Sequence, residues 1–377
     1  MIRRFSTIGI GRWRRFAARF DWPLFVAVGL ISALGLINLY SATLVTAADG
    51  HQYHSGKFDQ QVLWMGVGLA LYLGMTLIDY RNLTRVAWIV LAIGLVTGVI
   101  VFFLGRVTHG AQRWIDVGLF RVQPAEVLKL GVILCMAWMI HERELQPPPL
   151  KQSLLRWGAL FLPVILVAAQ PDLGSGTLIY LIILTTGYLT LSRLWPWVVL
   201  SVGSLLALPV LWEIMYGYQQ DRVLSFLECD DPLDKCYHTK QSILAIGSGQ
   251  ILGKGFLEGT QSRFKWVAEQ WTDFPFAVWA EEWGFIGSLA MLALFVFLLA
   301  WIINVALTAR DRFGTAICVG VAAMTFWHVV VNIGMELGLA PVVGVTLPLV
   351  SYGGSSVLIF FLSFGLVSSV SLRRHGY

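Results

Sequence analysis

The chain has 377 residues, of which 57% are hydrophobic and only 13% are charged, with 27 Lys and Arg against 22 Asp and Glu. Soluble globular domains carry about a quarter charged residues, so most of this chain cannot face water. The same composition excludes a disordered chain, a collagen-like repeat and a small secreted domain held by disulfides. It indicates a protein that crosses a membrane many times.

Ten apolar stretches predict ten transmembrane helices, because a helix needs about 20 residues to cross a bilayer. In chain order they cover residues 22–45, 62–78, 86–104, 125–140, 154–169, 177–191, 195–216, 274–307, 315–337 and 355–372. The expected fold is therefore an all-α polytopic integral membrane protein in which residues 1–377 form one transmembrane domain.

Lysine and arginine residues gather in the N-terminal tail, in every second connection and in the C-terminal tail. Sixteen of the 27 basic residues lie on this one side of the predicted helices. Short loops on the cytoplasmic side of a membrane carry such an excess, so we expect both termini in the cytoplasm. Residues 1–21 are expected to form a basic cytoplasmic tail.

The longest polar stretch, residues 217–273, lies between the seventh and eighth predicted helices and is expected to form a large periplasmic or extracellular loop. Its glycine-rich run, residues 247–255, lacks the spacing of a P-loop and follows no predicted strand, which disfavours a nucleotide site. Cys229 and Cys236 lie in this loop and could form a disulfide, because the outer side of the membrane is oxidising. Zinc is less favoured, since no second pair of Cys or His residues follows.

Five charged residues near the outer membrane boundary are candidates for function, because ionisable groups at membrane depth are costly. Glu126 and Lys129 share a helical face, where they either neutralise each other or present Lys129 to a ligand. Asp172, at a Pro and Gly break, either caps the next helix or pairs with Lys129. Asp273, where the large loop re-enters the membrane, either caps the eighth helix or acts as a general base. Arg113 suits an anionic headgroup or diphosphate, or is simply solvated.

These patterns leave three classes of protein open: a transporter, an enzyme that acts on a lipid-linked substrate, and a scaffold. The sequence contains no inverted pair of broken helices, which counts against a transporter. His328, inside the ninth span, is expected to be a hydrogen-bonded core histidine. No metal signature is visible, and no nucleic-acid partner is expected.

Nine short motifs, in order along nearly the whole chain, resemble those of the SEDS family (shape, elongation, division and sporulation proteins). They are GAQRWID at 110–116, QPAEVLK at 123–129, AAQPDLG at 168–174, QSILAIGSG at 241–249, GKG at 253–255, GTQS at 259–262, TDF at 272–274, AEE at 280–282 and PLVSYGGSS at 348–356. Gln170 and the GTQS motif are more similar to the elongation members than to the division paralogue FtsW.

The resemblance implies a peptidoglycan glycosyltransferase that polymerises lipid II into β-1,4 glycan at the outer face of the bacterial cytoplasmic membrane, during cell elongation and rod-shape maintenance. The resemblance further implies an inverting reaction in which Asp273 would be the general base for the acceptor hydroxyl. Arg113 and Lys129 would stabilise the departing diphosphate, and Glu126 and Asp172 would orient Lys129. The alternatives are a lipid II flippase and the division paralogue.

The resemblance also implies partners. These are a class B penicillin-binding protein, which is a transpeptidase with one membrane span, and other proteins of the elongation complex. No cofactor is evident in the sequence, although a divalent cation such as Mg²⁺ could share the charge of the diphosphate.

Overall fold

The computed structural model describes residues 19–46, 52–54, 56–104, 106–108, 111–116, 121–145, 149–190, 194–215, 217–227, 237–264, 266 and 269–374. Cys229, Cys236 and most of the predicted basic tail lie outside these residues, so the disulfide stays a prediction. The other two cysteines, Cys135 and Cys318, are buried free thiols.

Within the described residues, nine helices are long and apolar enough to cross a membrane, and a tenth, α4, is apolar but slightly shorter. The ten are α2 (Trp22–Ala42), α3 (Lys57–Leu77), α4 (Ala87–Leu104), α5 (Pro124–Leu145), α6 (Leu150–Ala169), α7 (Leu173–Thr190), α8 (Trp195–Ile214), α12 (Pro275–Leu307), α13 (Arg312–Glu336) and α14 (Gly354–Arg373). Each coincides with one predicted span, which confirms the expected fold class. The largest boundary differences occur at the start of α3 and the end of α5, where polar residues continue the helix beyond the apolar run.

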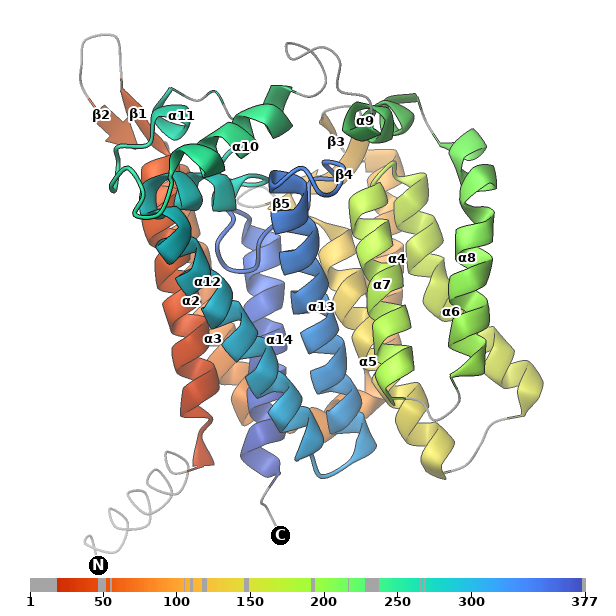
Figure 1. Ribbon diagram of the computed structural model, residues 1–377. Helices are drawn as coiled ribbons and strands as arrows, with labels where there is room; N and C mark the ends of the chain where they lie inside the picture. Colours follow the sequence, from red (N-terminus) through yellow and green to blue (C-terminus); the bar gives the residue numbers. More distant parts are fainter. Residues whose placement is uncertain are drawn as a thin grey trace, which may run out of the picture.

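The remaining elements are short and nearly all lie at one end of the helix bundle, which we call the upper end from its place in Figure 1. Two small antiparallel sheets pair β1 (Leu44–Thr46) with β2 (Gln52–His54), and β3 (Arg106–Thr108) with β4 (Ala111–Asp116) and β5 (Arg121–Val122). The segment between α8 and α12 contains α9 (Gly217–Leu227), α10 (Tyr237–Ser248) and α11 (Thr260–Arg263). The 3-10 helix η1 (Tyr80–Arg85) connects α3 to α4.

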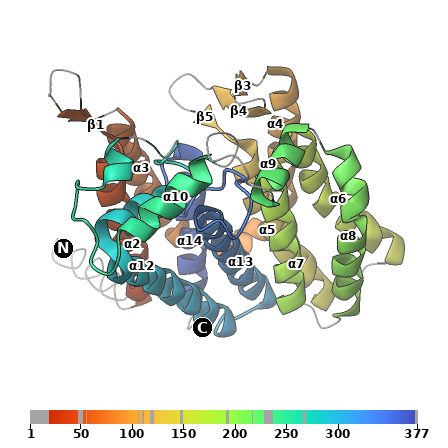
Figure 2. The same cartoon turned by 45° about the horizontal axis from the view of Figure 1, so that its top comes forward.

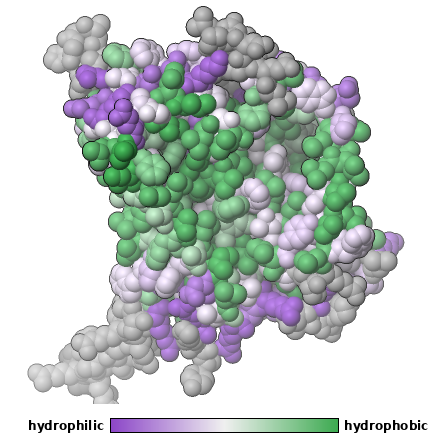
Figure 3. All heavy atoms as spheres, in the orientation of Figure 1, coloured by the Kyte–Doolittle hydropathy of each residue, from purple (hydrophilic) through white to green (hydrophobic). Residues whose placement is uncertain are grey.

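The bundle has a buried centre and an apolar outer surface. Most residues of α5, α13 and α14 are buried, whereas few residues of α6 and α8 are. Figure 3 shows a broad hydrophobic band over the spanning helices, with hydrophilic residues gathered above and below it. Since exposed apolar surface of this extent suits lipid rather than water, the chain is a multi-pass membrane protein. The start of α2 and the end of α14 lie at the same end of the bundle, opposite α9 and α10 (Figure 1).

The glycine-rich run at 247–255 docks on a break in α12. The break is at Gly284, whose φ of 64° is left-handed. The backbone amides of Lys254 and Gly255 donate to the carbonyls of Glu281 and Glu282, both at 3.0 Å. These amides are therefore committed to α12 and cannot cradle a phosphate. The glycine-rich run therefore attaches this loop to α12. The sequence pattern also disfavours a nucleotide site here.

Gly253→Ala is expected to destabilise the protein, because Gly253 has a φ of 82° and an added Cβ would lie 2.1 Å from the carbonyl oxygen of Glu282. Left-handed strain alone costs about 1–3 kcal/mol in the free energy of unfolding. Thermal melting of the purified protein in detergent measures the loss. The control is Gly247→Ala, where nothing lies within 4 Å of the added Cβ. Equal melting temperatures for the two variants would contradict the docking role of Gly253.

Candidate active site

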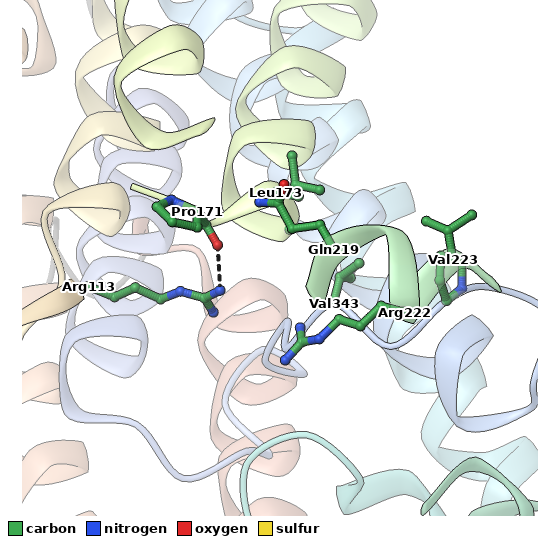
Figure 4. A pocket seen from close by; sticks show the side chains of 9 residues that line it. Arg113, Pro171, Leu173, Gln219, Arg222, Val223 and Val343 are labelled. Atoms are coloured by element: carbon green, nitrogen blue, oxygen red, sulfur yellow. Dashed lines mark hydrogen bonds between the residues drawn. The ribbon is translucent and has the colours of Figure 1, made fainter. Parts of the chain in front are cut away.

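A small pocket lies at the upper end of the bundle. Two arginines from different elements border it, Arg113 of β4 and Arg222 of α9, and Figure 4 shows their guanidinium groups pointing toward the same space. In Figure 2, α9 lies beside the upper end of α7. The other lining residues are Pro171, Leu173, Gly174, Gln219, Val223, Pro341 and Val343. The sequence analysis predicted a role for Arg113 but did not identify Arg222.

Arg113 is held by the connection between α6 and α7. Its Nη2 donates to the carbonyl of Pro171 at 2.8 Å, and its Nη1 lies 3.7 Å from Oδ1 of Asp172. Its buried Nε has no hydrogen-bond partner in the part of the chain that the structure describes. A guanidinium carries five N–H donors, so Arg113 is positioned by the protein and keeps donors for an anion.

Asp172 has two structural contacts besides Arg113. Its Oδ1 accepts from the backbone amide of Ser175 at 3.3 Å, which caps α7, and its Oδ2 accepts from Nε2 of Gln123 at 3.2 Å. The capping alternative for Asp172 is thus supported by its contacts. The alternative that paired it with Lys129 is wrong, because the cation beside Asp172 is Arg113.

Lys129 lies deeper, with its side chain only 1% exposed. Its ammonium donates to Oε1 of Glu126 at 2.7 Å and lies 2.8 Å from Nε2 of His328. Nδ1 of His328 is 2.9 Å from the carbonyl oxygen of Thr346. A carbonyl can only accept, so Nδ1 carries the proton and Nε2 accepts from Lys129. Glu126 and Lys129 therefore form a buried pair, and neither of them lines the arginine pocket.

Asp273 ends a tight turn immediately before α12. Its backbone amide and that of Thr272 both donate to the carbonyl of Glu269 at 3.0 Å. Burial and the charge of Glu269 together raise the pKa of the Asp273 carboxyl to about 6, while the charges of Arg222 and Arg113 and a hydrogen bond from Thr272 partly oppose this increase. Asp273 is not among the residues that line the pocket, but the charges of both pocket arginines act on it. A carboxylate with such a pKa is suited to accept a proton at neutral pH.

The cap of α12 comes from another residue. Oε1 and Oε2 of Glu336, at the end of α13, accept from the backbone amides of Phe276 and Ala277 at 3.2 and 2.6 Å. Phe274 occupies the N-cap position and makes no side-chain cap. The capping role considered for Asp273 is therefore filled by Glu336.

No metal site is present in the described ranges, where no three His, Cys, Asp or Glu side chains gather closely enough to hold an ion. The need for a divalent cation is untested and remains a prediction. The charge on the pocket comes instead from Arg113 and Arg222.

These features define a polytopic membrane protein with a carboxylate and two arginines at one end of its helix bundle. The family model for the cell cycle proteins FtsW, RodA and SpoVE matches residues 21–376. The chain belongs to this family, which confirms the resemblance that its motifs indicated.

Relatives and solved structures cover nearly the whole chain. Peptidoglycan glycosyltransferase MrdB of Escherichia coli K12 is 40% identical over 350 residues, which are 92% of this chain and 93% of that protein. Stage V sporulation protein E of Bacillus subtilis is 32% identical, over 93% of this chain and 96% of that protein.

Among solved structures, one chain of a peptidoglycan synthase complex that coordinates polymerization and crosslinking is 31% identical, with a TM-score of 0.74 over 95% of this chain and 99% of that chain. The rod shape determining protein RodA of Thermus thermophilus is 30% identical, with a TM-score of 0.69 over 95% of this chain and 98% of that chain.

Proposed function

We propose that this peptidoglycan glycosyltransferase polymerises lipid II into β-1,4 glycan at the outer face of the bacterial cytoplasmic membrane during cell elongation, with Asp273 as its general base. One observation carries the proposal. A partly buried carboxylate with its pKa raised to about 6, Asp273, is under the influence of the two arginines that border the pocket, and its Oδ2 lies close to Gly344, the neighbour of the pocket residue Val343. This is the combination of base and anion site that transfer from a diphosphate donor needs.

The chemistry follows from the donor. Lipid II carries its sugar through an α-linked diphosphate, so a β product requires inversion and attack in line with the departing group. Asp273 takes the proton of the acceptor 4-hydroxyl while the bond from the sugar to the diphosphate breaks. Arg113 and Arg222 bind the diphosphate, whose negative charge grows as it leaves. Lys129 has one ammonium donor beyond its contacts with Glu126 and His328, so a contact with the diphosphate stays part of the proposal.

We propose that the upper end faces the outside of the cell and that both termini lie in the cytoplasm, an orientation that the distribution of basic residues supports. A class B penicillin-binding protein is the proposed partner. The similar chain in a peptidoglycan synthase complex supports this proposal. Mg²⁺ could share the diphosphate charge with the two arginines.

The test is polymerisation of fluorescent lipid II by the purified protein together with a class B transpeptidase, with products resolved by length on a gel. Glycan polymer is the expected result. A parallel measurement in proteoliposomes follows movement of the lipid II headgroup across the membrane. Translocation without polymer would overturn the proposal and indicate a flippase. The absence of both activities would overturn it too and indicate a scaffold.

The rate of polymerisation is expected to rise with pH and to reach half its maximum near pH 6. A general base must be deprotonated to act, and the pKa of Asp273 is about 6, so activity is lost as the pH falls through this value. Initial rates between pH 5 and pH 8, at constant ionic strength, measure the profile. A rate that stays constant down to about pH 4.5, near the ordinary carboxyl pKa, would contradict the raised pKa.

A further inference from the structure

Three buried polar residues follow one face of α13 at intervals of four: His328, Asn332 and Glu336. Residues spaced by four lie above one another on a helix, and all three are at most 1% exposed. Each contacts backbone outside its own helix: His328 and Asn332 contact loops at the upper end of the bundle, and Glu336 contacts the first turn of α12. Burying a polar group in a membrane protein costs free energy unless the group is hydrogen-bonded, so such residues are often structural or functional.

Asn332, the middle residue, hydrogen-bonds to two loops: the turn that ends at Asp273 and the loop between α13 and α14 that contains Val345. Its Nδ2 donates to the backbone carbonyl of Asp273 at 3.0 Å and to that of Val345 at 2.8 Å. A side-chain amide has two N–H donors, and both are used here. The loop between α13 and α14 also passes close to the side chain of Asp273, because a Cβ added at Gly344 would lie 3.7 Å from Oδ2 of Asp273.

The loop held by Asn332 also forms part of the arginine pocket. Pro341 and Val343 line the pocket, a few residues before Val345. Arg222 donates to the carbonyl of Val342 at 3.3 Å. The side-chain amide of Asn332 therefore links the backbone of Asp273 to the loop that forms one wall of the arginine pocket.

The backbone on both sides of Asp273 is held as well. Buried side chains from α2, α13 and the turn itself make these contacts. Nε2 of Gln270, in the turn, donates to the carbonyls of Ala42 and Ser262 at 2.8 and 3.1 Å. Nδ2 of Asn38, in α2, donates to the carbonyl of Pro275 at 2.8 Å. The carboxyl group of Glu336, in α13, accepts from the amides of Phe276 and Ala277. Unlike these three, the side chain of Asn332 bonds to the backbone of Asp273 itself.

We propose that Asn332 is a positioning residue that fixes the general base relative to the anion pocket. The inference rests on the proposed function. In a displacement with inversion, the base and the departing diphosphate act on opposite sides of the reacting carbon. A shift of about 1 Å in such a group lowers a rate by about 100-fold. Asn332 provides this alignment without touching the substrate.

The main test is Asn332→Leu, which removes both donors, keeps the same branched side-chain skeleton and adds no charge. The kcat for lipid II polymerisation is expected to fall about 100-fold. KM should stay within about threefold of the wild-type value, because the arginines that bind the diphosphate are unchanged. Thermal melting and binding of labelled lipid II verify that the variant is folded.

The pH profile separates positioning from a loss of structure. A loosened turn lets water reach Asp273, so its pKa should fall from about 6 toward the ordinary carboxyl value. The acid limb of the rate profile then moves to lower pH. The other groups that act on or face Asp273 are Glu269 and Thr272 on the turn, Arg113 of β4, Arg222 of α9 and Glu336 of α13, and all of them are retained.

Thr325→Val is the matched control. Thr325 is fully buried on the same helix, and its hydroxyl donates to Val321 of that helix. Its kcat and acid limb should match those of the wild type. If Asn332→Leu does not fold, Asn332→Gln is used in its place. This variant keeps the amide but places it one methylene farther from the backbone. The same fall in kcat at constant KM is expected.

Polymer formation by the wild-type protein establishes the proposed function independently of the variants. Against that background, a folded Asn332 variant with a wild-type kcat and an unmoved acid limb would overturn the inference. So would equal losses in the Thr325 and Asn332 variants, since they would show a packing effect common to α13.

Discussion

Asp273→Asn is expected to lower the rate of lipid II polymerisation by about 100- to 10,000-fold, the range that a general base contributes. The amide has nearly the shape of the carboxyl group but cannot accept the proton of the acceptor hydroxyl. Because the cap of α12 comes from Glu336, the substitution should leave the helix and the melting temperature nearly unchanged. Initial rates with purified protein and fluorescent lipid II measure the effect.

The control for Asp273→Asn is Asp59→Asn, which removes an exposed carboxylate from the first turn of α3. Its polymerisation rate should equal that of the wild type. Labelled lipid II should bind all three proteins with similar affinity, since Arg113 and Arg222 remain. If polymerisation persists in a folded Asp273→Asn protein, Asp273 is not the base.

Lys129→Met is expected to lower the free energy of unfolding by about 3–5 kcal/mol, the cost of breaking a buried ion pair by removing one partner. The substitution leaves the carboxylate of Glu126, which is 4% exposed, without its cation. It also removes the donor to His328. Thermal and denaturant unfolding in detergent, followed by tryptophan fluorescence, measure the loss.

The double variant Glu126→Gln with Lys129→Met is the informative comparison. It removes both charges, so no uncompensated ion remains, and replacing both members of a buried pair is often close to neutral. The double variant should therefore be more stable than Lys129→Met alone. If both variants are equally destabilised, the loss comes from packing around Lys129 rather than from the unpaired carboxylate.

The fold could be predicted from the sequence because each span is a run of apolar residues. The errors lie at helix ends such as residues 57–61, where polar side chains continue α3. Periodicity and hydrophobicity cannot detect such a continuation, since the added turn is held by contacts with loops. Gln61, for example, donates to the carbonyl of Ser351, 290 residues away.

The site was predicted less completely, because its partners come from distant parts of the chain. Charge alone offered Lys129 as the partner of Asp172, but the fold places Arg113 of β4 there. Whether Asp273 capped α12 could not be decided from its neighbours, since the cap is supplied by Glu336 at the far end of α13. Asn332 had no sequence signal beyond being a polar residue in an apolar span.

The contact of Glu336 with the first turn of α12 has an electrostatic consequence for the base. Aligned peptide dipoles give a helix N-terminus a partial positive charge, which favours a nearby anion and makes a carboxyl group there more acidic. Asp273 lies just before this terminus, yet the amides of Phe276 and Ala277 already bind the carboxylate of Glu336. These two amides are therefore not free to donate to Asp273. Asp273 gains no hydrogen bond from the first turn of its own helix that would make it more acidic, and it keeps the affinity for a proton that its chemistry requires.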